Sequence, residues 1–250
     1  TTWFYRVATV YVIHHGVPYT LALTFVLPED TLVEVLKRLL LQVQGLGLQL
    51  NCLYLDKGFC VAPILEYLEK NGPPAILACT IRGKTGGTRS LCRGRRSYFT
   101  KYTFAAGKYP AHTVRMAVVR TYVRKKGKRK AVWLLYVVIR VKVSDPQTIR
   151  ARYRARFGIE CSYRCMRQTH AVTTSQNPLL RFFLISLAFL LVNLWITLRW
   201  HFCQVPRRGG RTVNKKLYEL QRQCHFLARV IEKLYGAATT IQAQVEPLDP

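Results

Sequence analysis

The sequence predicts an α/β protein in which helices flank a mixed sheet and a basic, β-rich insertion interrupts that core. Over the first third of the chain, apolar runs typical of strands alternate with amphipathic helical patterns in the order β-β-α-β-α-β. From Lys70 to Ser144 there is no Asp or Glu, and strand-like stretches are separated by turns rich in Gly and Lys. Half of the 250 residues are hydrophobic, so the chain can bury a substantial core.

The elements of the first third each have a local signal. Strands are expected at 4–13 and 18–27, because both are nearly continuous apolar runs. Thr31 and Glu34 form a capping box before a helix whose apolar residues recur at helical spacing as far as Val43. The remaining elements are a strand at 50–55, a helix at 61–71 and a strand at 75–81.

The rest of the chain begins with the basic segment, where strands are expected at 97–104, 112–122 and 131–143. A helical pattern returns at Gln147 and is followed by an apolar helix at 182–198 and an amphipathic helix near 217–235. We therefore expect a first part of the core at 1–81, the basic insertion at 82–144, a second part of the core at 145–203 and a C-terminal helical tail at 204–250.

The charge of the chain restricts its partners. Lys and Arg number 39 against 12 Asp and Glu, which gives a formal net charge of +27. This excess is too large for an ordinary metabolic enzyme, and a folded protein with so many cations usually meets a polyanion. The two candidate polyanions are a nucleic acid and an anionic membrane surface.

The densest run of positive charge lies at 124–130, between Tyr122 and Trp133. Such a run contacts phosphates without reading the bases, and neighbouring aromatic rings can stack on them. The candidate DNA-binding residues of this run are Lys125, Lys126, Lys128, Arg129 and Lys130.

The apolar segment 182–198 is the candidate for a membrane span. Its seventeen uncharged residues would form a helix of about 25 Å, shorter than the ~30 Å hydrocarbon core of a bilayer. Ser186 and Asn193 lie within it. We expect a buried core helix and no membrane partner, and a basic membrane-associated protein remains the competing interpretation.

The eight cysteines form no Cys-x-x-Cys motif, and several stand in apolar runs where a free thiol packs like a small hydrophobe. A disulfide framework is not expected, and a reducing cytoplasm suits this pattern best.

Two acidic residues are the candidates for chemistry, because acids are so scarce in this chain. Asp56 directly follows the apolar run 52–55, where a carboxylate would project from the carboxyl edge of the sheet. Glu160 would share one helical face with a phenol and three guanidinium groups, those of Tyr153, Arg156, Arg164 and Arg167. The arginines could meet phosphates while the carboxylate holds a divalent metal. Taken singly, an Asp after a strand is often a turn former and a Glu near Arg a solvated ion pair.

These residues carry a resemblance to a known family. Tyr153, Arg156, Glu160 and Arg167 are separated by two, three and six residues, which resembles the Tyr-Arg-Glu-Lys signature of the DDE transposases of bacterial insertion sequences, with Arg in place of the final Lys. The segment 53–59 resembles the motif around that family's second catalytic Asp. The strands before it and the segments 178–181 and 193–195 also resemble family motifs, so that the likeness covers roughly residues 3–200.

The resemblance implies an RNase H-like fold, with the basic β-rich insertion between the second and third catalytic acids. Asp56 and Glu160 would be the catalytic residues and the ligands of a two-ion Mg²⁺ site. Tyr153, Arg156, Arg164 and Arg167 would contact the backbone of the transposon end. The implied activity is DNA strand cleavage and strand transfer on double-stranded DNA, both transposon ends and target. The implied setting is a homodimer on DNA in a nucleoid-associated, cytoplasmic location in a bacterium or archaeon.

Two positions depart from the family pattern. Arg167 binds phosphate as Lys does, but with a different geometry. The family's first Asp has no counterpart, because no acid precedes Glu29, which with Asp30 starts the first helix. We expect that first Asp to lie upstream, so this chain would bind DNA without cleaving it. The alternative is a non-enzymatic, basic nucleic-acid-binding protein.

Overall fold

The computed structural model describes residues 6–14, 17–106, 109–125, 127–208, 210–214 and 216–236. Contacts between residues group the chain into two units. The first comprises residues 1–11 and 21–159, and the second comprises 12–20 and 160–250. Both units therefore contain part of the hairpin formed by the first two strands.

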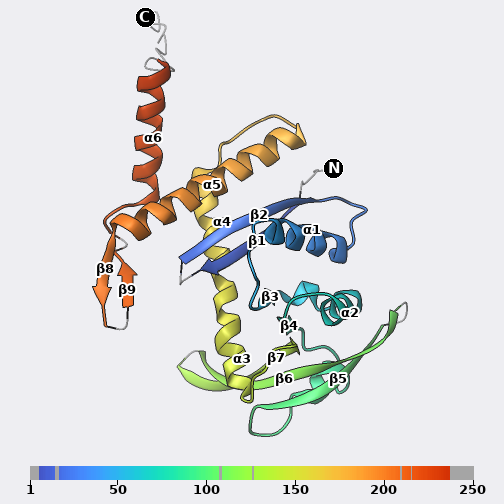
Figure 1. Ribbon diagram of the computed structural model, residues 1–250. Coiled ribbons are helices and arrows are strands. Elements are labelled where there is room, and N and C mark those ends of the chain that lie inside the picture. The colour runs from blue at the N-terminus through green and yellow to red at the C-terminus, as the bar shows by residue number, and fades with distance from the viewer. Residues whose placement is uncertain are drawn as a thin grey trace, which may run out of the picture. The chain divides into compact units, whose positions relative to one another are not determined.

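The order of elements follows the sequence-based expectation closely (Figure 1). Up to the helix after the sheet they are β1 Arg6–His14, β2 Val17–Val26, α1 Leu32–Gly45, β3 Leu53–Leu55, α2 Ala62–Lys70, β4 Ala75–Cys79, β5 Tyr98–Ala106, β6 Tyr109–Lys125, β7 Lys128–Ile139 and α3 Pro146–Tyr153. Three short 3₁₀ helices connect them or follow them, η1 Lys57–Phe59, η2 Gly87–Leu91 and η3 Arg154–Phe157.

A five-stranded mixed sheet organises the first unit, with strand order β3-β4-β7-β6-β5. β3 runs parallel to β4, with Leu55 opposite Leu77, whereas β7 pairs with β4 in the antiparallel sense. The basic segment therefore forms no separate body. Its three strands, β5 to β7, extend the same sheet that β3 and β4 begin, because β7 returns along the whole length of β4.

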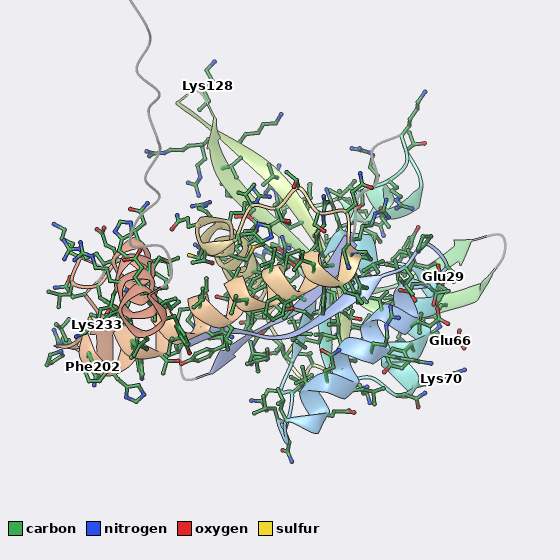
Figure 2. The ribbon with its side chains drawn as sticks, turned by 90° about the horizontal axis from the view of Figure 1, so that it is seen from above. Glu29, Glu66, Lys70, Lys128, Phe202 and Lys233 are labelled. Carbon is green, nitrogen blue, oxygen red and sulfur yellow. The ribbon has the colours of Figure 1, made fainter. Side chains whose placement is uncertain are left out.

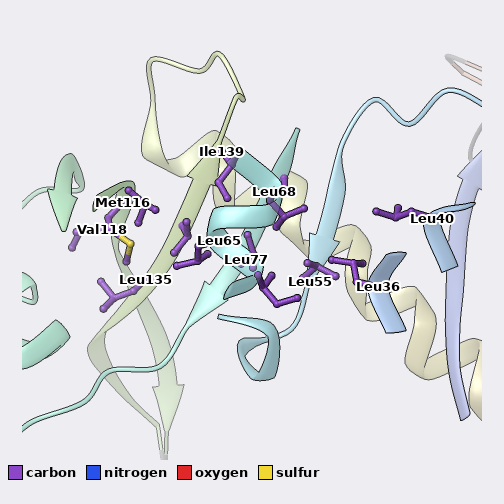
Figure 3. Packing of buried hydrophobic residues seen from close by; sticks show 14 residues of the cluster. Leu36, Leu40, Leu55, Leu65, Leu68, Leu77, Met116, Val118, Leu135 and Ile139 are labelled. Atoms are coloured by element: carbon purple, nitrogen blue, oxygen red, sulfur yellow. The ribbon is translucent and has the colours of Figure 1, made fainter. Parts of the chain in front are cut away.

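Apolar side chains cover both faces of this sheet. One face packs against α2, whose Ile64, Leu65 and Leu68 are fully buried, and Leu36 and Leu40 of α1 join the same cluster (Figure 3). The opposite face is covered by α3, and the buried ring of Tyr153 in that helix packs against it. The alternation of strand side chains between two helical layers explains the largely apolar character of β4 and β7.

α1 begins as the capping box predicts. The Thr31 hydroxyl accepts the backbone N–H of Glu34 at 3.3 Å, and the Glu34 carboxylate accepts the N–H of Thr31 at 2.8 Å. The pKa of Glu34 lies below its ordinary value, chiefly because of the backbone N–H of Thr31. The apolar face of the helix packs on the hairpin residues of the first unit through Val35, Leu39 and Val43.

The second unit contains α4 Gly158–Thr169 from Glu160 onward, α5 Pro178–Phe202, β8 Gln204–Arg207, β9 Gly210–Val213 and α6 Leu220–Tyr235. By length and composition, α5 is the one helix among the described residues that could cross a membrane. The expectation that it is buried holds on one face only, where Ala188, Phe189 and Val192 are enclosed.

Polar groups of α5 bind other parts of the second unit. The Asn193 amide donates to the backbone carbonyl of Thr20 at 2.7 Å, and its oxygen accepts the N–H of the same residue at 3.1 Å. The Trp195 indole N–H donates to the Tyr218 carbonyl at 2.9 Å. These bonds fix α5 to backbone groups of its own unit.

Candidate functional site

Asp56 lies where β3 ends and the chain turns toward α2. Its Oδ1 accepts the backbone N–H of Lys57 at 2.7 Å and thereby caps η1, and half of its side chain is exposed. Since β3 and β4 are parallel, this is the carboxyl edge of the strand pair, where α/β sheets place their ligands. Asp56 is thus both a turn former and an accessible carboxylate.

Tyr153 lies at the end of α3 and reaches back to the same strand end. Its ring is buried between Tyr54 and Tyr136, with centroids 6.4 and 5.0 Å away, and its hydroxyl donates to the carbonyl of Leu55 at 3.0 Å. Burial raises the pKa of Tyr153 to about 12, so the hydroxyl keeps its proton at neutral pH. The resemblance implied a DNA contact for this phenol. In the structure the phenol is buried, and its hydrogen bond fixes the backbone carbonyl of Leu55, the residue before Asp56.

Arg156 follows one turn later, in η3. Its Nη2 lies 4.0 Å from Oδ1 of Asp56, at the outer limit of an ion pair, and only 18% of its side chain is exposed. Its guanidinium carbon lies 5.7 Å from the ring centre of Tyr153 and 5.2 Å from that of Phe157. The aromatic rings hold the guanidinium beside the carboxylate.

Asp56, Tyr153 and Arg156 therefore meet although about a hundred positions separate the carboxylate from the other two. Burial of Tyr153 against the sheet produces the meeting, since it places the start of η3 next to the end of β3. Two of the four signature residues, Tyr153 and Arg156, thus lie beside the candidate catalytic residue Asp56.

The expectation of one continuous helix through the signature is wrong. The 3₁₀ helix η3 separates α3 from α4, so Tyr153 and Glu160 do not share a regular α-helical face. α4 then starts at Gly158, where an added Cβ would lie 2.8 Å from Cε1 and Cζ of Tyr11. A side chain at position 158 would therefore force the outer end of the Tyr11 ring to move, which helix propensity alone does not reveal.

Glu160 begins the second unit, in the first turn of α4, where a carboxylate suits the positive end of the helix. Arg164 and Arg167 follow at positions four and seven, on the same face, and all three side chains are exposed. The other face of α4 is fixed, because the hydroxyl of buried Ser162 hydrogen-bonds that of Thr20 at 2.7 Å. Since Asp56 and Glu160 belong to different units, their approach stays a prediction.

The donor atoms fit a hard cation such as Mg²⁺ only in part. Asp56 and Glu160 are exposed carboxylates, and Mg²⁺ commonly takes one or two of these and keeps several waters. Within the described ranges, no group of three or more His, Cys, Asp and Glu side chains is placed to hold a metal ion. Each of the two carboxylates, one in each unit, offers a single ligand group.

The second feature of the first unit is the hairpin of β6 and β7. Its strands extend to a turn at Gly127, whose φ of 75° suits glycine, and Lys128 stands at the far end of the hairpin (Figure 2). Lys128, Arg129 and Lys130 are exposed. Lys126 lies outside the described residues, and for Lys125 only the backbone is described.

The strand register places like charges opposite each other in this hairpin. Arg124 pairs with Arg129, and Lys125 pairs with Lys128. Like charges in directly opposed positions destabilise a β-hairpin, and no acid occurs between Lys70 and Ser144 to offset them. An external polyanion would relieve this repulsion.

Arginines also lie over aromatic rings along the hairpin. The guanidinium carbon of Arg129 is 4.3 Å from the ring centre of Tyr122, and that of Arg120 is 5.4 Å from Tyr122 and 5.9 Å from Trp133. Sequence reasoning noted the two rings but missed Arg120, which only the pairing of β6 with β7 sets opposite Trp133.

Comparison with protein families and with curated proteins finds no match for this chain.

Proposed function

We propose that this chain is the catalytic part of a DDE-type DNA transposase with an RNase H-like core. The single observation that supports this most is the meeting of Asp56 with Tyr153 and Arg156 at the end of β3. In an unrelated basic protein, nothing requires a scarce carboxylate to lie beside two signature residues about a hundred positions away.

Asp56 and Glu160 are proposed to hold Mg²⁺. When bound, the metal would supply positive charge that activates a water or a DNA 3′-hydroxyl and stabilises the leaving oxygen. Tyr153 orients the strand end that carries Asp56. Arg156, beside this carboxylate, is placed to orient the scissile phosphate.

DNA would be held by two sets of cations. Arg164 and Arg167 contact the backbone of the transposon end from α4, and the hairpin tip contacts phosphates further along the duplex. Because the chain offers only two of the family's three catalytic carboxylates, we expect it to bind duplex DNA without cleaving it. A homodimer on DNA in a nucleoid-associated, cytoplasmic location belongs to the same proposal.

The test is metal binding in the presence of duplex DNA, with Mn²⁺ as a paramagnetic replacement for Mg²⁺. Asp56→Asn and Glu160→Gln should each weaken Mn²⁺ affinity about tenfold or more, because each removes one charged ligand. Glu66→Gln is the control, since this half-exposed acid on α2 pairs with Lys70 at 2.7 Å (Figure 2). Equal Mn²⁺ affinity in all three variants would contradict the proposal.

A second candidate is a non-enzymatic nucleic-acid-binding protein, favoured by the opposed cations of the β6–β7 hairpin. It requires duplex binding that depends on salt but neither on divalent metal nor on Asp56. DNA affinity measured with and without Mg²⁺, in the wild type and in Asp56→Asn, separates the two candidates.

A further inference from the structure

The outer part of the β6–β7 hairpin is a two-stranded ribbon. β5 pairs with β6 only as far as Val118, and β4 pairs with β7 only as far as Leu135. Beyond these points, among the described strands, β6 and β7 pair only with each other, up to the turn at Gly127. The ribbon therefore leaves the sheet, and Lys128 stands at its far end (Figure 2).

Arg120 fixes the base of this ribbon. Its backbone N–H donates to the hydroxyl of Ser97 at 2.9 Å, and its carbonyl accepts from the side-chain amide of Gln147 at 3.0 Å. Its guanidinium donates to the carbonyl of Arg95 at 3.0 Å. The free ribbon thus begins at position 121, and the remaining residues of β6 extend about 17 Å from there, at ~3.4 Å per residue.

One face of the free ribbon combines arginines with an aromatic ring. Side chains alternate between the two faces along a strand and opposed residues share a face, so Tyr122, Arg124 and Arg129 lie on the same face. All three are exposed. The guanidinium carbon of Arg129 lies 4.3 Å from the ring centre of Tyr122, within the range of a cation–π contact. The ring therefore orients the guanidinium of Arg129, and Arg124 stands directly opposite Arg129.

The other face of the ribbon has a different composition. Thr121 is opposite Val132 and Val123 is opposite Lys130, so this face is aliphatic near the sheet and cationic toward the turn. A lysine ammonium is a compact point charge, whereas an arginine guanidinium is a planar fork that can donate two parallel hydrogen bonds. The lysine face therefore suits single phosphates, and the arginine face suits a pair of acceptors that lie in one plane.

We propose that the arginine face of this ribbon enters the major groove of duplex DNA and reads guanine through Arg124 and Arg129. The proposal rests on the DNA binding that both candidate functions share. The major groove is about 12 Å wide and ~8.5 Å deep and admits a two-stranded ribbon, whereas the minor groove is only about 6 Å wide. A reach of about 17 Å exceeds the depth of the major groove, so the outer ribbon can meet base edges while the sheet stays outside.

The composition of the ribbon selects the base. Residues 121–132 include no Asn, Gln, Asp or Glu. Asn and Gln are the side chains that form two hydrogen bonds with adenine, and Asp and Glu accept from cytosine. Guanine presents two acceptors, O6 and N7, which match the parallel donors of a guanidinium. Since Arg124 and Arg129 are directly opposed, we expect them to contact adjacent G·C pairs, whose acceptors would relieve the repulsion between the two cations.

The experiment measures the affinity of the chain for a short duplex with a central run of G·C pairs. Replacing guanine by 7-deazaguanine removes the N7 acceptor and should lower the affinity about tenfold or more. Replacing guanine by inosine keeps O6 and N7 but removes the amino group in the minor groove, and it should leave the affinity unchanged. In the double variant Arg124→Lys, Arg129→Lys, the affinity for the guanine duplex should fall to that for the 7-deazaguanine duplex, because lysine keeps the charge but lacks the fork.

The matched control makes the same change at two exposed arginines of α6, Arg222→Lys and Arg229→Lys, and should distinguish the duplexes as the wild type does. Salt-dependent binding with equal affinity for the guanine and 7-deazaguanine duplexes would overturn the proposal and leave DNA binding intact. Absence of duplex binding would overturn the proposed function as well. A loss of affinity with inosine alone, or tighter binding of the single strand than of the duplex, would exclude the major-groove contact. Circular dichroism of each variant confirms that a lost affinity does not reflect unfolding.

Discussion

The phenol of Tyr153 connects the helix after the sheet to the end of β3, one residue before Asp56. Its hydrogen bond to the Leu55 carbonyl is buried, and a buried carbonyl left without a donor costs free energy. A single atom, Oη, thus links the first signature residue to the position of the candidate catalytic carboxylate.

Tyr153→Phe should lower the free energy of unfolding by about 1–3 kcal/mol, because the Leu55 carbonyl loses its donor while the ring stays packed. Urea unfolding at neutral pH measures the change. Tyr122→Phe is the control, since Tyr122 lies 46% exposed on the hairpin and its ring is retained. Equal stability of the two variants would show that the Tyr153 hydroxyl does not support the fold.

The same side chain predicts a pH dependence. The folded pKa of Tyr153 is raised, so the folded state keeps a proton that an unfolded tyrosine releases near its ordinary value of 10.0. Its stabilising effect is complete below pH 10 and is lost as pH rises toward about 12. The free energy of unfolding of Tyr153→Phe should therefore fall less steeply than that of the wild type over this range, and parallel slopes would contradict the assignment.

Gly158 is a second residue whose replacement should change the stability of the protein. Gly158→Ala should destabilise the protein although Ala favours a helix by about 1 kcal/mol, because its Cβ would meet the ring of Tyr11. Gly45→Ala in α1 has nothing within 4 Å and should be neutral or stabilising. Thermal unfolding compares the two, and a Gly158→Ala variant as stable as Gly45→Ala would show that Tyr11 moves aside freely.

Among the elements, the β6–β7 hairpin places cations opposite cations, and its own segment contains no acid. Replacing Lys128, Arg129 and Lys130 by Gln should lower DNA affinity and reduce the slope of log affinity against log salt by about 0.9 for each phosphate that the variant no longer neutralises. The control replaces three exposed cations of α6, Arg222, Arg229 and Lys233, which changes the net charge equally. An equal reduction in both variants would mean that net charge, and not the hairpin, determines DNA binding.

α5 shows how far composition can mislead about an element. Its apolar sequence predicts burial, yet only three of its side chains are enclosed in the described residues. Its two polar anchors, Asn193 and Trp195, instead bind backbone groups of Thr20 and Tyr218. Hydrogen bonds from a side-chain amide or indole to strand or loop backbone cannot be predicted from hydrophobic periodicity.

At the scale of the whole molecule, the central prediction is that Asp56 and Glu160 approach within about 8 Å, which is the reach of a two-metal site. A double-mutant cycle on Mn²⁺ affinity tests it with Asp56→Asn and Glu160→Gln, alone and combined. If the two carboxylates hold the same metal site, their effects are strongly non-additive. Additive losses would place the carboxylates at separate sites and end the catalytic interpretation.

Much of the architecture was predictable because local signals agree with it. The capping box at Thr31, the apolar runs of β4 and β7 and the Gly- and Lys-rich hairpin turn each specify their own element. The candidate site was predictable only as a set of residues. The 3₁₀ helix between Tyr153 and Glu160 was not predicted, because helix periodicity does not register a turn that tightens under packing, and Gly158 was the local sign against a continuous helix.

The sequence by itself determined the order of strands and helices as far as α5, the positive charge and the candidate residues for metal and phosphate binding, because these depend on side-chain chemistry and near neighbours. The hairpin of β8 and β9 was not predicted, since the segment 204–250 was expected to be a helical tail. The tertiary structure decided that the basic strands join the core sheet, that Tyr153 turns inward to the Leu55 carbonyl and that Arg156 stands beside Asp56. Such contacts depend on strand register and on burial of apolar surface between distant segments, and no local pattern encodes them.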